Sequence, residues 1–126
     1  MKRLVFSFVV LCILFVYNYY SEKYVLDYCR KLDSTLQKCA NELIEKNYSS
    51  AKETADELIN NWENNNILLS VFIGDGSVVE PEKSIITIYH SINDKNYDYC
   101  LLAVRECQGY INEISKNTET NPANVL

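Results

Sequence analysis

The sequence is poor in residues that break helices and in residues that carry acid–base chemistry. Its 126 residues include three glycines, two prolines and one histidine. Glycine and proline are the strongest local signals for turns, so this composition predicts a chain that is mostly helical. No nucleophile elbow, phosphate-binding loop or metal motif occurs, and the sequence therefore offers no catalytic constellation.

The sequence also lacks the C-x-x-C pairs that are typical of zinc and redox sites. Four of its five cysteines lie beyond the N-terminal apolar run: Cys29, Cys39, Cys100 and Cys107. Within one helix the first two would be about 15 Å apart and the last two about 10 Å, whereas a disulfide needs Cα atoms within about 7 Å. A bridge such as Cys39–Cys100 is geometrically allowed between antiparallel neighbours. The interpretation we favour is four buried thiols that pack as small apolar side chains.

Positive charge is scarce outside the first three residues. Without Lys2 and Arg3, ten basic residues face 17 acidic ones, so the rest of the chain carries a net charge of −7. Proteins that bind nucleic acid neutralise phosphates with lysine and arginine, so this balance argues against such a partner. It argues equally against electrostatic attachment to anionic lipids.

A long apolar run is present, and it directly follows the two basic residues. Leu4 to Tyr20 carries no charge and would rise about 25 Å as a helix, near the minimum that crosses a bilayer core of about 30 Å. Tyrosines gather at its C-terminal end, where aromatic rings favour the headgroup region. The positive-inside rule then places the N-terminus in the cytoplasm and the rest outside the cytoplasmic membrane. We predict that residues 1–20 are a single-pass signal-anchor.

A cleaved secretory signal peptide is the alternative for this segment. Cleavage needs small residues in an A-x-A-like pattern just after the apolar core. The residues from Val16 to Tyr20 are bulky, and the first small residue is Ser21. We therefore favour the uncleaved anchor, with cleavage near Ser21 as the main alternative. A buried helix of a soluble protein is the third option, but nothing downstream is apolar enough to surround it.

Apolar residues after the span recur at spacings of three and four, which indicates amphipathic helices. The first helix is predicted over about 22–46 and the second from a capping box at Ser50 through the apolar segment Ile67–Ile73. The third is expected to begin near Pro81, after a turn at Gly74–Gly76. The last spans about Tyr97–Ser115. The prediction is an all-α fold: a bundle of about four antiparallel helices over residues 21–116, with a tail at 117–126.

The sequence contains a short internal repeat. Lys46-Asn47-Tyr48 recurs as Lys95-Asn96-Tyr97, an offset of 49 residues that also superposes the apolar stripes around both copies. Two helical hairpins of similar design, paired in a tetratricopeptide-like manner, would produce this pattern. Chance agreement between two helical stripes is the alternative.

The chain resembles a family of short, membrane-anchored helical proteins of Gram-positive, Clostridia-like bacteria that is catalogued only as a domain of unknown function. The resemblance rests on the basic start, the apolar span, the Asn47-Tyr48-x-x-Ala51 turn, the single Trp62 and the Asn-Val-Leu end. Members usually carry histidines at positions that correspond to Gly74 and about Ile114 here, so no histidine role carries over. The resemblance implies a fold and a location, but no activity or cofactor.

Few residues in the sequence could take part in catalysis or in metal binding. His90 is read as a surface histidine, because its only candidate partner on the same helix is Asp94. The acidic residues near Gly74 lack the alternating pattern of a calcium loop. Five residues on or beside the apolar stripes are candidate interaction or packing anchors: Leu58, Trp62, Val104, Tyr48 and Tyr97.

These observations favour a non-enzymatic interaction or accessory module. It would need no cofactor or metal, would be tethered to the membrane through Leu4–Tyr20, and would have another membrane or envelope protein as its partner. A groove between two helical hairpins is the kind of surface that accepts a peptide or a helix. The alternative is a small-ligand or metal-binding sensor that uses the four exported cysteines or an acidic helix face.

Overall fold

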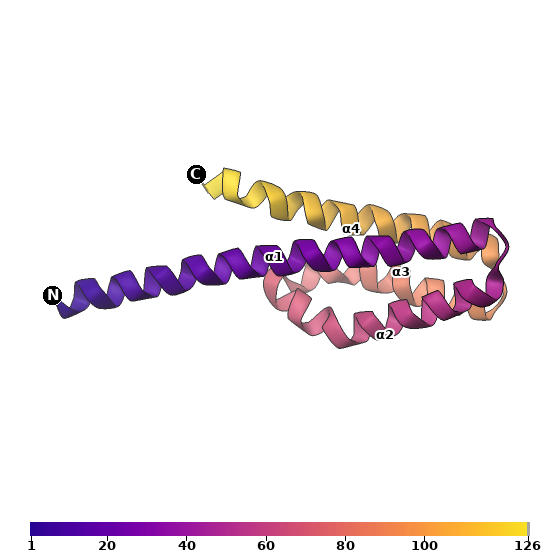
Figure 1. Cartoon of the computed structure of the whole chain (residues 1–126), viewed down its shortest axis with the longest axis horizontal. Coiled ribbons are helices and arrows are strands. Elements are labelled where there is room, and N and C mark those ends of the chain that lie inside the picture. Colours follow the sequence, from indigo (N-terminus) through magenta and orange to yellow (C-terminus); the bar gives the residue numbers. More distant parts are fainter. Residues whose placement is uncertain (126) are drawn as a thin grey trace.

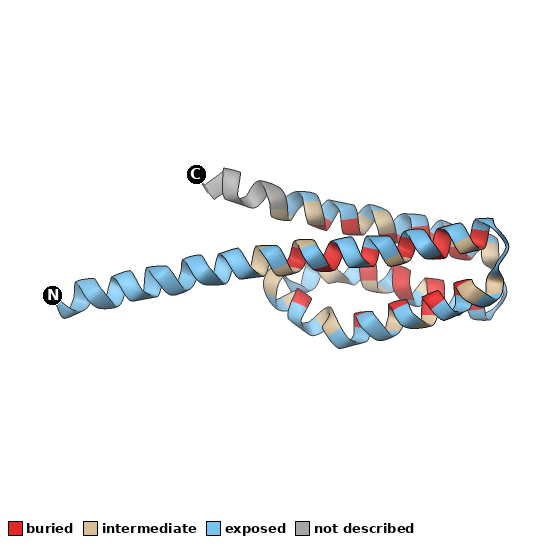
Figure 2. Ribbon diagram, in the orientation of Figure 1, coloured by how far each residue is buried: buried red, intermediate tan, exposed pale blue. Residues whose placement is uncertain are grey.

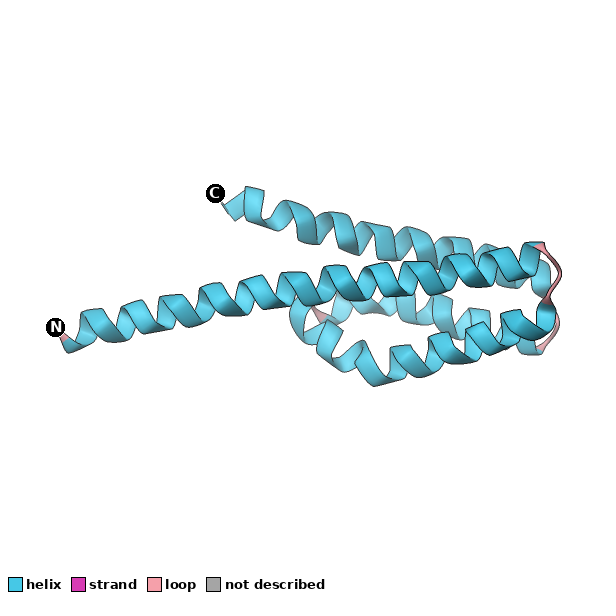
Figure 3. Cartoon of the chain, in the orientation of Figure 1, coloured by secondary structure: helices cyan, strands magenta, loops and turns pink. Residues whose placement is uncertain are grey.

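The computed structural model describes the backbone of residues 1–125 and the side chains of residues 1–118. The described residues form four helices: α1 (Lys2–Ile44), α2 (Tyr48–Ile73), α3 (Asp75–Asn93) and α4 (Tyr97–Val125). They run up, down, up and down, and the described part contains no strand (Figures 1 and 3). Each helix packs against its neighbours in sequence, and α1 closes the ring against α4. The predicted all-α antiparallel bundle is confirmed.

The core consists of the predicted apolar stripes. Each helix turns one stripe inward, with Leu36 of α1, Leu58 of α2, Ile88 of α3 and Val104 of α4 all essentially fully buried. Figure 2 shows the buried residues on the faces of the helices that meet, and exposed residues on the outward faces. A stripe with a helical period can be buried only against another stripe, and four such stripes close into a bundle.

Two turns of the same design join the helices at the end of the bundle far from the N-terminus. Lys46 and Lys95 have positive φ angles of 62° and 61°. The amides of Asn47 and Asn96, one residue further on, donate to carbonyl oxygens five residues back, at 2.8 and 2.9 Å. These are Schellman caps, in which a left-handed residue ends the helix. The repeated tripeptide thus has one conformation in both copies, which supports the predicted pair of similar hairpins.

The turn between α2 and α3 is shorter than expected. Only Gly74 is non-helical, with a positive φ of 92°, a conformation that favours glycine. The prediction that α3 begins near Pro81 was wrong, because the helix begins at Asp75 and Pro81 lies inside it. Proline removes the amide that would bond to the carbonyl of Ser77, four residues earlier. Ser77 is exposed, so that carbonyl can bond to water at little cost.

Two long helices extend through boundaries that the sequence suggested. The segment Ile67–Ile73 is helical, as predicted, because α2 continues through the three asparagines before it. α4 continues ten residues beyond the expected end at Ser115. The division into residues 1–20, 21–116 and 117–126 falls within α1 and α4 and stays a prediction. Docking of the Val125-Leu126 end lies outside the described side chains.

Candidate functional surfaces

Three of the predicted anchors lie in the core. Leu58, Trp62 and Val104 are 1%, 2% and 0% exposed. The Trp62 indole Nε1 donates to Oε1 of Glu82 on α3, at 3.5 Å, and the Asn66 amide donates to the same oxygen at 3.4 Å. A partner can reach these residues only if the bundle opens, so in the closed bundle they act as packing anchors.

The other two anchors, Tyr48 and Tyr97, meet at the distal end. Their rings are stacked, with centroids 3.7 Å apart and planes at 2°. Each is the first residue of its helix and follows one of the two equivalent turns. Because the two tyrosines are related by the 49-residue offset, their stack lies where the two hairpins meet. Both side chains are half-buried, and this stack is the one predicted site residue pair that solvent reaches.

The four cysteines beyond the span are free, buried thiols, as favoured from the sequence. Cys39 of α1 hydrogen-bonds to Cys100 of α4, and this bond together with burial raises the pKa of Cys39 above its usual range. Burial raises the pKa of Cys107 to about 12. Burial and the nearby charge of Asp33 raise that of Cys29 to about 11. Cys29, Cys39 and Cys107 are therefore protonated, buried thiols, which are poor nucleophiles and poor metal ligands. The same hydrogen bond with Cys39 lowers the pKa of Cys100, whose thiol is also buried.

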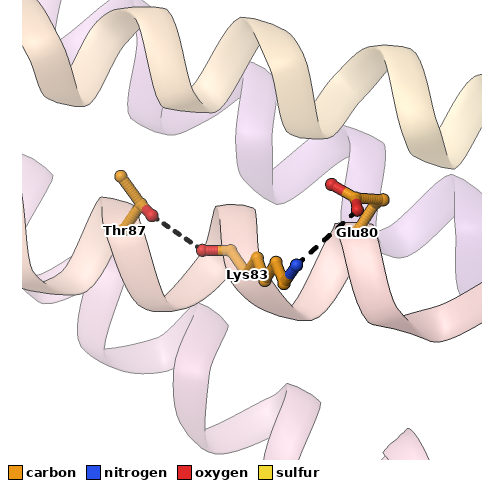
Figure 4. Close-up of polar contacts among 3 residues, drawn as sticks. All are labelled: Glu80, Lys83 and Thr87. Carbon is orange, nitrogen blue, oxygen red and sulfur yellow. Dashed lines mark hydrogen bonds and ion pairs between the residues drawn. The ribbon is translucent and has the colours of Figure 1, made fainter.

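The polar residues of the described part do not converge on a chemical site. No group of three or more His, Cys, Asp or Glu among these residues is arranged to hold a metal ion. His90 is exposed, and its ring lies 5.6 Å from that of Tyr89. On the outer face of α3, Lys83 Nζ lies 3.8 Å from Oε1 of Glu80, and the Thr87 hydroxyl donates to the Lys83 carbonyl oxygen at 2.8 Å (Figure 4). Exposed pairs of this kind contribute little stability.

A cluster of aromatic side chains packs the C-terminal end of α2 against α1, next to the apolar segment Leu4–Tyr20. The Phe72 ring lies 5.7 Å from Tyr17 and 5.4 Å from Tyr24, in edge-to-face arrangements. Tyr24 also stacks on Tyr28 at 5.9 Å and donates to Oδ1 of Asn65 at 3.3 Å. In the sequence, Tyr17 is one of the tyrosines at the C-terminal end of the apolar run Leu4–Tyr20, and Phe72 belongs to the apolar segment Ile67–Ile73. Nothing in the sequence indicated that they meet.

Apolar side chains are exposed on the α2–α3 turn beside this cluster. Ile67 and Val71 of α2 are 76% and 63% exposed, and Leu68 and Val79 are also exposed. Figure 1 shows the turn alongside α1, where that helix leaves the bundle. Sequence reasoning assigned this segment to a helix but missed its exposure, because its run of apolar residues has no polar face from which to read an orientation.

The N-terminal part of α1 is the other exposed apolar surface. Every residue from 1 to 20 is exposed, and the rest of the chain covers none of the apolar segment. Within the described residues, α1 is the one helix that is long and apolar enough to cross a membrane, a test that signal sequences also pass. The apolar segment at the start of α1 thus lies outside the core of the bundle.

Comparison with known proteins adds one finding. The protein-family model described as "Domain of unknown function (DUF4363)" matches residues 19–125. The match covers the bundle and omits most of the apolar span. No curated protein and no solved structure matches the chain.

Proposed function

Because the chain belongs to the DUF4363 family, whose description assigns no activity, we propose its role from its geometry. The protein is a membrane-tethered, non-enzymatic interaction or accessory module. Leu4–Tyr20 spans the cytoplasmic membrane once, with the N-terminus inside and the bundle outside. Its partner is another membrane or envelope protein.

One observation supports this proposal above the others: the apolar span and a wall of the bundle are one continuous helix. α1 runs from Lys2 to Ile44, and only its second half, from Val25 onward, contributes buried side chains. The first half would expose a large apolar area to water, which is unfavourable by roughly 25 cal/mol per Å². A bilayer removes that cost, and the unbroken helix then holds the bundle at a set distance from the membrane.

The bundle has the properties of a scaffold rather than of a reaction chamber. Its core is filled by side chains from all four helices. A shallow depression lies on one face of α1 and is lined by residues between Asp33 and Glu42 of that helix alone. A depression on one helix face does not enclose a substrate. The sensor alternative would use the four cysteines, which are buried, or an acidic helix face. No group of three or more His, Cys, Asp or Glu among the described residues is arranged to hold a metal ion.

The proposal is tested by capture of partners from membranes after mild crosslinking. The bait is the full chain with a C-terminal tag, and the matched bait carries an unrelated apolar span in place of Leu4–Tyr20. We expect one membrane or envelope protein to be enriched with both baits, which assigns recognition to the bundle. Enrichment with the native span alone would assign it to the span. If neither bait enriches any protein above an untagged control, the interaction role is wrong.

A further inference from the structure

We propose that the α2–α3 turn is a second membrane contact, which rests in the interfacial layer of the bilayer beside the point where α1 leaves it. The contact surface consists of Ile67, Leu68, Val71 and Val79. This inference rests on the proposed span. It adds a lipid-binding surface on the bundle and fixes how the bundle stands on the membrane.

The ring contacts of Phe72 place the α2–α3 turn beside the part of α1 in which the proposed span ends. Phe72 contacts both Tyr17 and Tyr24, at 5.7 and 5.4 Å between ring centroids. Tyr17 lies in the last turn of the predicted span, and Tyr24 is about 10 Å further along the helix axis. The two rings therefore bracket the layer in which a bilayer of this orientation would have its headgroups. A residue that touches both rings must lie in the same layer.

The side chains near Phe72 in the sequence are apolar and exposed, as is expected of residues that contact the interfacial layer of a bilayer. Eight large apolar residues are exposed among the described side chains after Tyr20, and half of them lie in the short stretch from Ile67 to Val79. Ile67 and Val71 are four residues apart and so share one strip of the helix. An exposed apolar patch of this kind on a small protein marks a contact surface. Its position beside the span identifies the occupant as lipid.

The charged residues along the α2–α3 segment indicate which force would hold the turn against the bilayer. No lysine or arginine occurs between Lys52 and Lys83, and Asp75 begins α3 at the tip. The turn therefore cannot be held by attraction to anionic headgroups and must bind by burial of apolar surface. Interfacial segments of this type enter about 5–10 Å into the boundary between headgroups and acyl chains. Contact is expected to be shallow and insensitive to salt and to lipid charge.

The test places an environment-sensitive fluorophore at three positions of the full chain in phosphatidylcholine nanodiscs that hold one copy each. The native Cys12, in the span, reports on the anchor. In a Cys12→Ala background, Val71→Cys reports on the turn, and Ile44→Cys is the matched control. Ile44 is 56% exposed against 63% for Val71, but it lies at the distal end of the bundle. The remaining cysteines are buried and do not take the label. Circular dichroism verifies the fold of each variant.

Cys12 lies at the middle of Leu4–Tyr20, about 12 Å from either end of the span, so the nanodiscs contain two nitroxide lipids. One carries the nitroxide near the headgroup end of the acyl chain and the other near its methyl end, and together they quench probes that touch the bilayer at either depth. We expect the probes at positions 12 and 71 to lose most of their fluorescence and the probe at position 44 to lose little. Replacement of part of the lipid by phosphatidylglycerol, or addition of salt, should leave the loss at position 71 unchanged.

Two results would overturn the inference and are distinguishable. If position 12 is quenched while position 71 loses no more than position 44, the span stands and the turn does not touch lipid, which would leave a neighbouring protein or a second copy as its occupant. If position 12 is not quenched, the proposed anchor itself is wrong, and the second contact is wrong with it.

Discussion

At the scale of single residues, burial separates the side chains that hold the bundle together from those that face outward. Leu58 of α2 and Leu102 of α4 illustrate the contrast, since they are 1% and 54% exposed. Removal of a buried leucine side chain loses its transfer free energy and leaves a cavity. Removal of an exposed one loses neither.

Leu58→Ala should therefore lower the free energy of unfolding by about 2–5 kcal/mol. Leu102→Ala should change it by less than about 0.5 kcal/mol. Both are measured by urea denaturation of the full chain in detergent, with circular dichroism as the readout. Equal effects of the two substitutions would mean that the stripe around Leu58 is not the core.

Burial of the Cys107 thiol makes the free energy of unfolding depend on pH in the alkaline range. In the unfolded chain Cys107 ionises near the ordinary pKa of 9.0, whereas burial raises its pKa to about 12 in the fold. Between these values the unfolded chain has lost a proton that the folded chain retains. The thiol's contribution to stability is complete below pH 9 and is lost as pH rises toward 12, by about 1.4 kcal/mol per unit.

We expect the free energy of unfolding to decrease above pH 9, and to decrease less steeply in Cys107→Ala. The cavity left by the substitution lowers stability at every pH, so the slope is the informative quantity. A thiol reagent should also label the wild-type chain only at Cys12 until it unfolds. Rapid labelling of Cys107 in the folded protein, or an unchanged slope in the variant, would contradict its burial.

At the scale of elements, the two distal turns show how a repeated tripeptide directs the chain. Lys46 and Lys95 both adopt a left-handed conformation in which an L-residue is strained by roughly 1–2 kcal/mol. Glycine relieves that strain but makes the unfolded chain more flexible, which offsets part of the gain.

Lys46→Gly and Lys95→Gly should therefore each stabilise the protein, by up to about 1 kcal/mol. The control is Lys38→Gly, at an exposed position in the middle of α1, where glycine should destabilise by about 1 kcal/mol. Thermal unfolding of the three variants gives the signs directly. Destabilisation by glycine at both turns would show that the lysine side chains, and not the backbone, hold these turns.

At the scale of the whole molecule, one continuous helix, α1, joins the apolar segment to the bundle. Before the apolar segment of α1 the charged residues are Lys2 and Arg3, whereas the chain after that segment carries a net charge of −7. Such a chain is expected to insert with its N-terminus inside.

A C-terminal alkaline phosphatase fusion should accordingly be active in bacterial cells, and a C-terminal green fluorescent protein fusion should be dark. Lys2→Glu combined with Arg3→Glu removes the charge bias and should reduce phosphatase activity per molecule. The intact mass of the membrane-extracted protein should include residues 1–20. A bright fluorescent fusion, or a mass that begins near Ser21, would contradict the orientation or the uncleaved anchor respectively.

The sequence by itself determined the features that depend on near neighbours. The spacing of apolar residues located all four helices and most of their buried faces, and the repeated Lys-Asn-Tyr located the two equivalent turns. These predictions succeeded because helical periodicity and helix caps are set within a few residues. The candidate anchors were found for the same reason, since they lie on or beside the stripes.

Only the tertiary structure decided which stripes meet and what remains uncovered. It buried Trp62 against α3, brought Cys39 beside Cys100, and set Phe72 between Tyr17 and Tyr24. It also extended α3 back through Pro81 to Asp75, against the local proline signal. These outcomes follow from the lengths of the helices and from the way they pack. Contacts between residues tens of positions apart depend on that packing, which local sequence patterns do not specify.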